Sequence, residues 1–376
     1  MLSLTFILYL SIMLSTTILA SASQKKRHDG TVVFRKKLFW MAFLVHWIFI
    51  AFTNIGTDHD SYVAILEYDA FRRIAMGSEV GFNGLCLLLY QFTHNAEIGI
   101  FIIKTLTLGF AYLSFYLLRE RASMGWVVGA YNAWQYLFSF CILAHSLSIS
   151  LVILAATLAI SGKKWYGPVA LTALASTIHA SALVMLLVMI GLYALNIVKT
   201  KLSFSLVVIL LIAAMITLNN ISTVFNYFVT DVSGFEQYEN NDMSGNVGSG
   251  LFNYVLFAYL FVIIIIPVLQ SKMEYNYRNA IILFYMFSLI SALMGYYLGT
   301  ARLNQYSIVF YGVAIPWFFY QQEHKLIQTK PFLTLDMQRI AWMVYVLFVA
   351  YSSLRMSANP AGTRDMANYV FFNPFS

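Results

Sequence analysis

The sequence has 376 residues, of which 60% are hydrophobic and only 10% carry a charge. Soluble domains are usually about a quarter charged, so this composition excludes both a soluble globular enzyme and a disordered protein. The formal net charge of +7 does not indicate nucleic acid binding, because the basic residues form short clusters between apolar stretches. That distribution is typical of a polytopic membrane protein.

Apolar stretches recur along the whole chain and predict an all-α integral membrane protein with a single domain, residues 1–376. About twelve transmembrane helices are expected. They lie roughly at 2–22, 38–55, 97–118, 125–143, 147–161, 165–179, 181–198, 203–221, 251–269, 279–298, 303–320 and 339–354.

The first apolar stretch ends in Ala20-Ser21-Ala22, which resembles a signal-peptidase site. However, no basic residue precedes the stretch, and Lys25-Lys26-Arg27 follows it directly. This order of charges predicts a retained helix whose N-terminus faces outside.

The remaining basic residues agree with that orientation. If the N-terminus is outside, the inner loops, together with Arg339 at the last helix boundary, carry 17 of the 23 Lys and Arg residues. These loops are 23–37, 119–124, 162–164, 199–202, 270–278 and 321–338. Positive charge marks the cytoplasmic side, so both ends of the chain are predicted to face outside.

Two long segments, 56–96 and 222–250, are expected on the outer side. Within the first, the apolar stretch 82–92 is too short to span a bilayer, so we expect a re-entrant or interfacial segment that shapes a cavity. The second is rich in Gly, Asn, Asp and Ser, which is typical of a mobile loop. Most acidic residues also lie on this side, so candidate chemistry gathers at the outer face.

The densest polar constellation follows the second predicted helix. Its members are Asp58, His59, Asp60, Tyr62, Arg72, Arg73 and Glu79. Paired carboxylates beside a histidine suit a general base, and an arginine pair suits a phosphate group, which it grips through bidentate hydrogen bonds. The alternative is a solvated loop whose charges satisfy one another. No spacing of metal ligands is present.

Two histidines lie near the ends of later predicted helices. His179 follows a short helix, where an ionisable group is costly unless it faces a cavity or finds a partner. The alternative is that His179 bonds a neighbouring carbonyl. His145 lies just beyond the fourth predicted helix, and a bond to a neighbouring carbonyl is the preferred interpretation for it.

Arg302 and Tyr306 are four residues apart, so on a helix they would share one face. An arginine beside a helix N-terminus makes an anion site, because the terminus adds free N–H groups and partial positive charge. The alternative is an arginine that reaches to lipid headgroups. Arg364 and Asp365 in the outer tail are more simply interpreted as a local ion pair.

The chain shows no sign of a metal or cofactor. Cys86 and Cys141 lie in or beside apolar stretches, and we interpret them as small packing residues. No phosphate loop of the GxxxxGK[ST] type is present, which argues against an ATP-driven motor.

These motifs together resemble the EpsG/Wzy-type family of bacterial polysaccharide polymerases. The resemblance is carried by Asp58-x-Asp60-x-Tyr62, Glu79-x-Gly81-Phe82, Ala175-Ser176-x-Ile178-His179-x-Ser181-Ala182-Leu183 and Arg302-x-x-x-Tyr306. In one place the chain departs from the family pattern. Such proteins often carry an Arg-Gln pair before the fifth helix, where this chain has Ala144-His145.

The resemblance implies a glycosyltransferase of the bacterial inner membrane, with both termini in the periplasm. It would join undecaprenyl-diphosphate-linked oligosaccharide repeat units at the periplasmic face, as in O-antigen or capsular polysaccharide synthesis. The expected catalytic residues are His179, Asp58, Asp60 and Glu79. The expected substrate-binding residues are Arg302, Tyr306, Arg72, Arg73 and Tyr62.

No metal or cofactor would be needed, because the glycosyl diphosphate bond stores the energy and arginine stabilises the leaving group. Membrane lipid surrounds such a protein, and a polysaccharide chain-length regulator would be a partner. Two alternatives stay open, a transporter or flippase of the same lipid-linked sugars and an O-antigen ligase. A transporter would place charges near the middle of the bilayer, whereas here nearly all candidates lie at the outer face.

Overall fold

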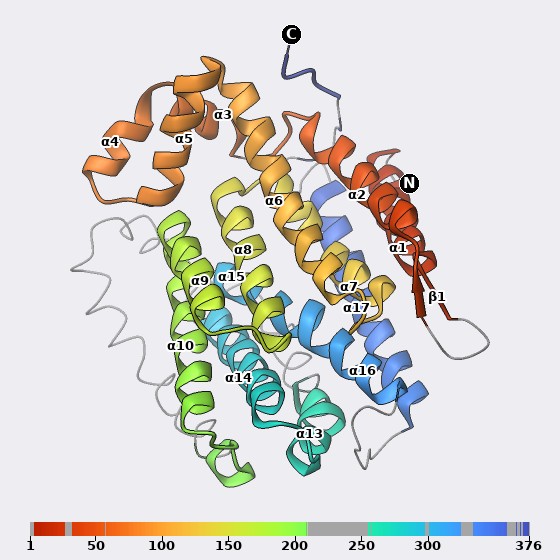
Figure 1. The fold of residues 1–376 in the computed structure, drawn as a ribbon. Helices are drawn as coiled ribbons and strands as arrows, with labels where there is room; N and C mark the ends of the chain where they lie inside the picture. Colours follow the sequence, from red (N-terminus) through yellow and green to blue (C-terminus); the bar gives the residue numbers. More distant parts are fainter. Residues whose placement is uncertain are drawn as a thin grey trace.

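The computed structural model describes residues 4–26, 32–56, 58–207, 209, 255, 257–297, 301–324, 334–358, 366, 369 and 371–375. About 82% of the structure is helical and almost none of it is sheet, which confirms the all-α class (Figure 1). A short antiparallel hairpin pairs β1 (Gln24–Lys26) with β2 (Val32–Phe34). The predicted outer loop 222–250 lies outside the described residues, as do Arg364 and Asp365.

The first half of the described chain contains α1 (Leu4–Ala22), α2 (Lys36–Ala51), α3 (His59–Ala64), α4 (Ala70–Ala75), α5 (Val80–Thr93), α6 (Ala96–Leu118), α7 (Met124–Tyr131), α8 (Leu143–Ile160), α9 (Tyr166–Ile178) and α10 (Leu183–Ile197). The second half contains α13 (Ile266–Gln270), α14 (Tyr275–Tyr297), α15 (Ala301–Gln305), α16 (Ile315–Glu323) and α17 (Leu335–Ala358). Short π or 3-10 turns adjoin them at η1 (Ile65–Asp69), η2 (Asn132–Tyr136), η3 (Leu137–Phe140), η4 (Ala180–Ala182), η6 (Phe261–Ile265) and η7 (Val309–Ala314).

Helix α8 forms the centre of the bundle. It packs against α6 on one side and α9 on another, and every one of its residues except Leu158 is buried. Helices α10 and α17 instead expose large apolar side chains such as Leu187 and Leu347. Such surfaces are unfavourable in water and match the hydrocarbon of a bilayer, so the bundle has a protein-filled centre and a lipid-like exterior.

Five of the described helices are long and apolar enough to cross a membrane. They are α1, α6, α8, the run Ala180–Ile197 and α17. The expectation of about twelve spans is therefore not confirmed. At least three expected spans are interrupted by π or 3-10 turns. Residues 124–140 run as α7, η2 and η3, residues 261–270 run as η6 and α13, and 301–323 contains α15, η7 and α16. Most of the expected span 203–221 lies outside the described residues.

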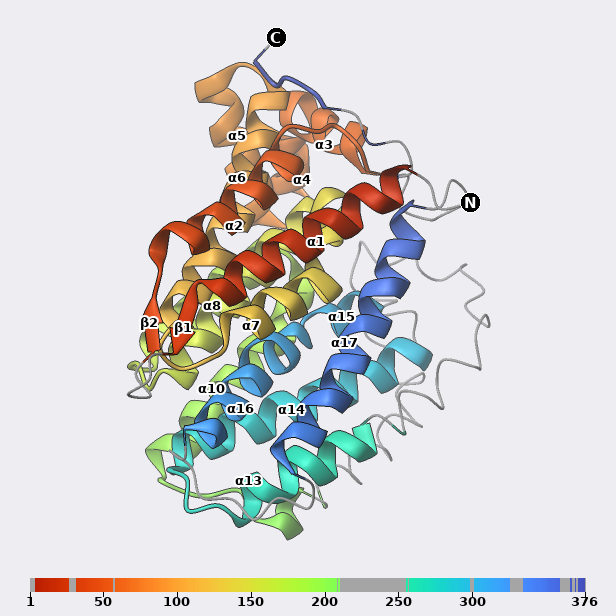
Figure 2. The same ribbon diagram turned by 90° about the vertical axis from the view of Figure 1, so that its right-hand side faces the viewer.

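Residues 58–93 form a group of short helices at one end of the bundle, which we call the lobe (Figure 1). It comprises α3, η1, α4 and α5, and it packs on α6 and α9. The apolar stretch 82–92 thus forms part of a short helix, α5, and its position relative to a bilayer stays a prediction. The C-terminal residues lie at the same end, where the Phe372 N–H donates to the Phe52 carbonyl at 3.0 Å. Figure 2 shows α1 lying along α2, with the β-hairpin at the far end of α1 from the lobe.

Candidate functional site

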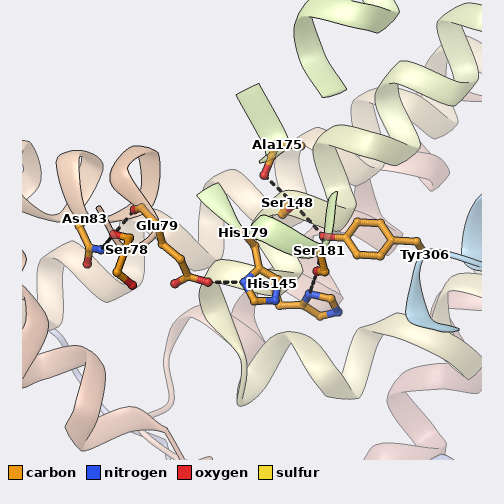
Figure 3. Close-up of polar contacts among 9 residues, drawn as sticks. All are labelled: Ser78, Glu79, Asn83, His145, Ser148, Ala175, His179, Ser181 and Tyr306. Carbon is orange, nitrogen blue, oxygen red and sulfur yellow. Dashed lines mark hydrogen bonds and ion pairs between the residues drawn. The ribbon is translucent and has the colours of Figure 1, made fainter. Parts of the chain in front are cut away.

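The lobe meets the bundle through a contact between a carboxylate and an imidazole. Glu79 Oε1 is paired with Nδ1 of His179, although the two residues are a hundred positions apart in the sequence (Figure 3). Both side chains are largely shielded, with 25% of the Glu79 side chain and 13% of the His179 side chain exposed. The structure thus joins two residues that the sequence proposed separately.

Glu79 is held in place by the turn that starts α5. Its backbone is left-handed, with φ of 40°, which is uncommon for a residue other than glycine. The buried Asn83 stabilises this turn, because its side-chain amide donates to the Ser78 carbonyl at 2.6 Å and to the Glu79 carbonyl at 3.2 Å. Non-glycine residues in this conformation cluster at functional sites, where the surrounding structure holds them.

His179 is held at a break between two helices. Helix α9 ends at Ile178, and His179 adopts an extended backbone with φ of −149° before η4 and α10 begin. Its N–H still donates to the Ala175 carbonyl at 2.9 Å, which completes the last turn of α9. The break turns the imidazole away from the helical row and toward Glu79 (Figure 3).

Gly81 allows the two elements to approach. A Cβ at this position would lie 2.9 Å from the carbonyl carbon and Cβ of Thr177. That separation is shorter than real Cβ contacts, so only glycine lets α5 come this close to the end of α9. The sequence Glu79-x-Gly81 therefore supplies the carboxylate and also the small residue that lets this carboxylate approach His179.

The second ring nitrogen of His179 takes no part in the contact with Glu79. Nε2 is buried and forms no hydrogen bond to any described residue. Because the carboxylate accepts a hydrogen bond at Nδ1, we assign the proton of the neutral ring to Nδ1, which leaves Nε2 as a proton acceptor. A carboxylate that orients a histidine in this way is the arrangement by which histidine serves as a general base.

A second histidine lies directly behind His179. His145 is fully buried in the first turn of α8, and its ring meets the His179 ring edge to face, with centroids 4.6 Å apart. From the sequence, a bond to a neighbouring carbonyl was the preferred interpretation of His145, which lies just beyond the fourth predicted helix. One signal pointed elsewhere. His145 and Ser148 are three residues apart on one face of a helix that carries no charged residue.

Tyr306 belongs to the same buried group. It follows α15 and is fully buried, and its hydroxyl lies 2.9 Å from Ser148 Oγ and 3.3 Å from Ser181 Oγ. Arg302 has its backbone in α15, but its side chain lies outside the described part of the structure. The predicted shared face of the two residues stays a prediction.

The other sequence candidates lie elsewhere in the lobe. Asp58 immediately precedes α3, and Asp60 is exposed within α3; among the described residues, neither forms a hydrogen bond or ion pair with Glu79 or His179. Tyr62 is buried, and its ring packs against Phe82 with centroids 5.6 Å apart.

The arginine pair and His59 complete the lobe. Arg72 and Arg73 lie in the last turn of α4, where the Arg72 side chain is exposed and the Arg73 side chain is half-buried. His59, between the two aspartates, is instead paired with Glu97 at 3.0 Å, which ties the start of the lobe to the first turn of α6. The two carboxylates flanking His59 are therefore not its ion-pair partner. The lobe thus offers arginines near its surface and a second histidine–glutamate pair at its base.

No group of three or more potential metal ligands is found among the described residues. The polar side chains that meet between the lobe and the bundle are instead suited to proton transfer at Nε2 of His179. The structure is that of a membrane-type helical bundle with an acid–histidine pair at one end.

A sequence model of the EpsG family matches residues 36–363, which is most of the chain and includes both Glu79 and His179. No curated protein and no solved structure matches the chain.

Proposed function

The chain belongs to the EpsG family, a Wzy-type, polymerase-like family of membrane proteins, and we propose that it polymerises lipid-linked oligosaccharides. The reaction would join undecaprenyl-diphosphate-linked repeat units at the periplasmic face of the bacterial inner membrane. The observation that carries the proposal is the pairing of Glu79 with His179, which leaves Nε2 of the histidine as a buried acceptor.

In the proposed step, Nε2 of His179 takes the proton from a sugar hydroxyl of one repeat unit. The hydroxyl oxygen attacks the anomeric carbon of the growing chain, and a new glycosidic C–O bond forms. The bond from that carbon to the diphosphate oxygen breaks, and polyprenyl diphosphate leaves with the electron pair. Glu79 stabilises the imidazolium formed in this step, and the proton then passes to solvent.

The leaving diphosphate needs positive charge, which we assign to Arg302 with Arg72 or Arg73. Arginine suits this role because its planar group donates two parallel hydrogen bonds to phosphate oxygens. Stabilising the developing charge in this way requires no metal ion. The roles of three further lobe residues stay predictions, namely substrate binding by Tyr62 and catalysis by Asp58 and Asp60.

The test uses purified protein in detergent and lipid-linked repeat units as the only substrate. Elongation should proceed without nucleotide sugar or ATP and should persist in a chelator. His179→Gln should lower the rate by about 10²- to 10⁴-fold, the usual contribution of a general base, and Glu79→Gln should lower it more than Asp60→Asn does.

The chain offers a matched control for the glutamate substitution. Glu97 also pairs with a histidine and is 26% exposed, close to the 25% of Glu79, but it lies at the base of the lobe. Glu97→Gln should therefore retain most of the rate that Glu79→Gln loses. Equal losses from the two variants would contradict the assignment of Glu79. If the wild-type protein binds the substrate but never extends it, the polymerase proposal fails and the flippase alternative takes its place.

A further inference from the structure

His145 lies at the head of a buried hydrogen-bond chain that ends beside His179. Its Nδ1 is 3.5 Å from Ser181 Oγ, Ser181 donates to the Tyr306 hydroxyl at 3.3 Å, and that hydroxyl lies 2.9 Å from Ser148 Oγ (Figure 3). Ser148 in turn donates to the Ala175 carbonyl at 2.9 Å. Three elements contribute, namely α8, α9 and η4, together with Tyr306, which follows α15.

The direction of this chain follows from its last link. A carbonyl only accepts, so the Ser148 hydrogen is used on Ala175, and Tyr306 must donate to Ser148. Ser181 then donates to Tyr306, so its oxygen is left to accept from His145. We therefore assign the proton of His145 to Nδ1, so that every hydroxyl in the chain donates once. Aligned chains of this kind are cooperative, because each bond polarises the next.

The chain reaches His179 by two routes. The Ala175 carbonyl at its end also accepts the backbone N–H of His179 at 2.9 Å. At its start, the His145 ring lies edge to face against the His179 ring, at 82° and 4.6 Å between centroids. Tyr306 holds His145 from another side, with ring planes at 89° and centroids 5.1 Å apart.

We propose that His145 is a positioning residue that fixes the ring plane of His179. The ring of His179 turns only about its Cα–Cβ and Cβ–Cγ bonds, and the hydrogen bond from Nδ1 restrains both rotations only as firmly as the Glu79 side chain is itself held. The perpendicular contact with His145, which belongs to the central helix α8, adds a second restraint on the ring, so that Nε2 keeps one direction toward the reacting hydroxyl. The inference rests on the proposed function, and it assigns Tyr306 to the support of the site.

The experiment compares two substitutions at the same position in the elongation assay. Misplacement of a catalytic group by about 1 Å costs about 100-fold in rate, so His145→Ala should lower kcat by up to that factor with little change in KM. His145→Phe keeps an aromatic edge against His179, and it should recover about tenfold of that loss. If His145 acts through its ring contact and not by transferring a proton, the pH profile of His145→Phe should keep the wild-type shape.

Three outcomes would overturn the inference. His145→Ala with the wild-type kcat would show that the contact does nothing. His145→Phe no faster than His145→Ala would show that a nitrogen of His145, and not its ring, is required. A raised KM at unchanged kcat would make His145 a substrate ligand. If the phenylalanine variant does not accumulate in the membrane, Ser181→Ala serves instead, and an unchanged kcat in that variant contradicts the proposal.

A second measurement separates this inference from the proposed reaction. Diethyl pyrocarbonate modifies imidazole nitrogens, and mass spectrometry reads the rate at His179 without any turnover. Release of the ring in His145→Ala should speed this modification, and His145→Phe should slow it again. If the protein never elongates a substrate but its variants show this order of modification rates, the proposed function is refuted and the positioning role of His145 is retained. Equal rates of His179 modification in the wild-type protein, His145→Ala and His145→Phe would refute the positioning role.

Discussion

Gly81→Ala tests whether the close packing of α5 on α9 sets the geometry of the acid–histidine pair. The added Cβ would lie 2.9 Å from the carbonyl carbon and Cβ of Thr177, and closer still to its Oγ1, which can rotate away. Ordinary contact begins at 3.4 Å, so the two elements must separate by at least about 0.5 Å. Glu79 is two residues before the glycine, and His179 is two residues after the threonine. The displacement therefore acts directly on their contact.

The expected loss can be scaled from this displacement. If about 1 Å costs about 100-fold, then half that distance costs about tenfold in kcat, which is about 1.4 kcal/mol in the barrier. The strain of overpacking, about 1–3 kcal/mol, also exceeds the gain of about 1 kcal/mol from replacing a helical glycine by alanine. Gly81→Ala should thus lower both the elongation rate and the thermal stability.

Gly84→Ala is the matched control, because Gly84 lies in the same helix and a Cβ there meets nothing within 4 Å. This variant should keep the elongation rate and gain up to about 1 kcal/mol of stability from helix propensity. Initial rates at saturating lipid-linked substrate and thermal unfolding in the same detergent provide the two readouts. If the two alanine variants elongate at equal rates, the contact of α5 with α9 does not position the site.

Three further predictions address the arginine, the tyrosine and the topology. Arg302→Lys keeps the charge but loses the planar guanidinium group and should shorten the polymer, while Arg302→Ala should abolish the polymer. Long polymer from the alanine variant would show that Arg302 only contacts lipid headgroups. Tyr306→Phe removes a buried hydroxyl and should cost about 1 kcal/mol of stability with KM unchanged; a raised KM would make Tyr306 a substrate ligand. Ser61→Cys should react with an impermeant thiol reagent in intact cells and Lys164→Cys should not, since both native cysteines are buried, and the reverse order would invert the topology.

Helical segments were predictable where an apolar stretch has the length of a helix and charged or polar residues mark its ends. Helix α6 was expected at 97–118 and runs Ala96–Leu118, and α10 was expected at 181–198 and runs Leu183–Ile197. The breaks within 124–140 and 301–323 were not predicted, because a π turn changes the hydrogen bonding and not the apolar composition. The hairpin of β1 and β2 was also missed, since three-residue strands in a basic loop show no alternating pattern.

Residues of the candidate site could be predicted from the sequence, but the contact between Glu79 and His179 could not. Glu79 and His179 were both singled out, but nothing in the sequence relates two residues a hundred positions apart. Their contact depends on how α5 packs on α9, which is a tertiary property set by Gly81. The contact between the rings of His145 and His179 was not predicted for the same reason, because the two residues lie on different elements.

The central place of α8 has a consequence for how the sequence can vary. Helix α8 and the run Ala180–Ile197 are almost equally apolar, yet almost all of α8 is buried by protein, and most of the second run is not. Lipid adapts to any apolar side chain, whereas a close-packed interior responds to each added or lost methylene. Exchanges among leucine, valine and phenylalanine should therefore accumulate freely on the exposed face of α10 and be purged from α8. Two helices that a hydropathy plot draws alike would drift at very different rates.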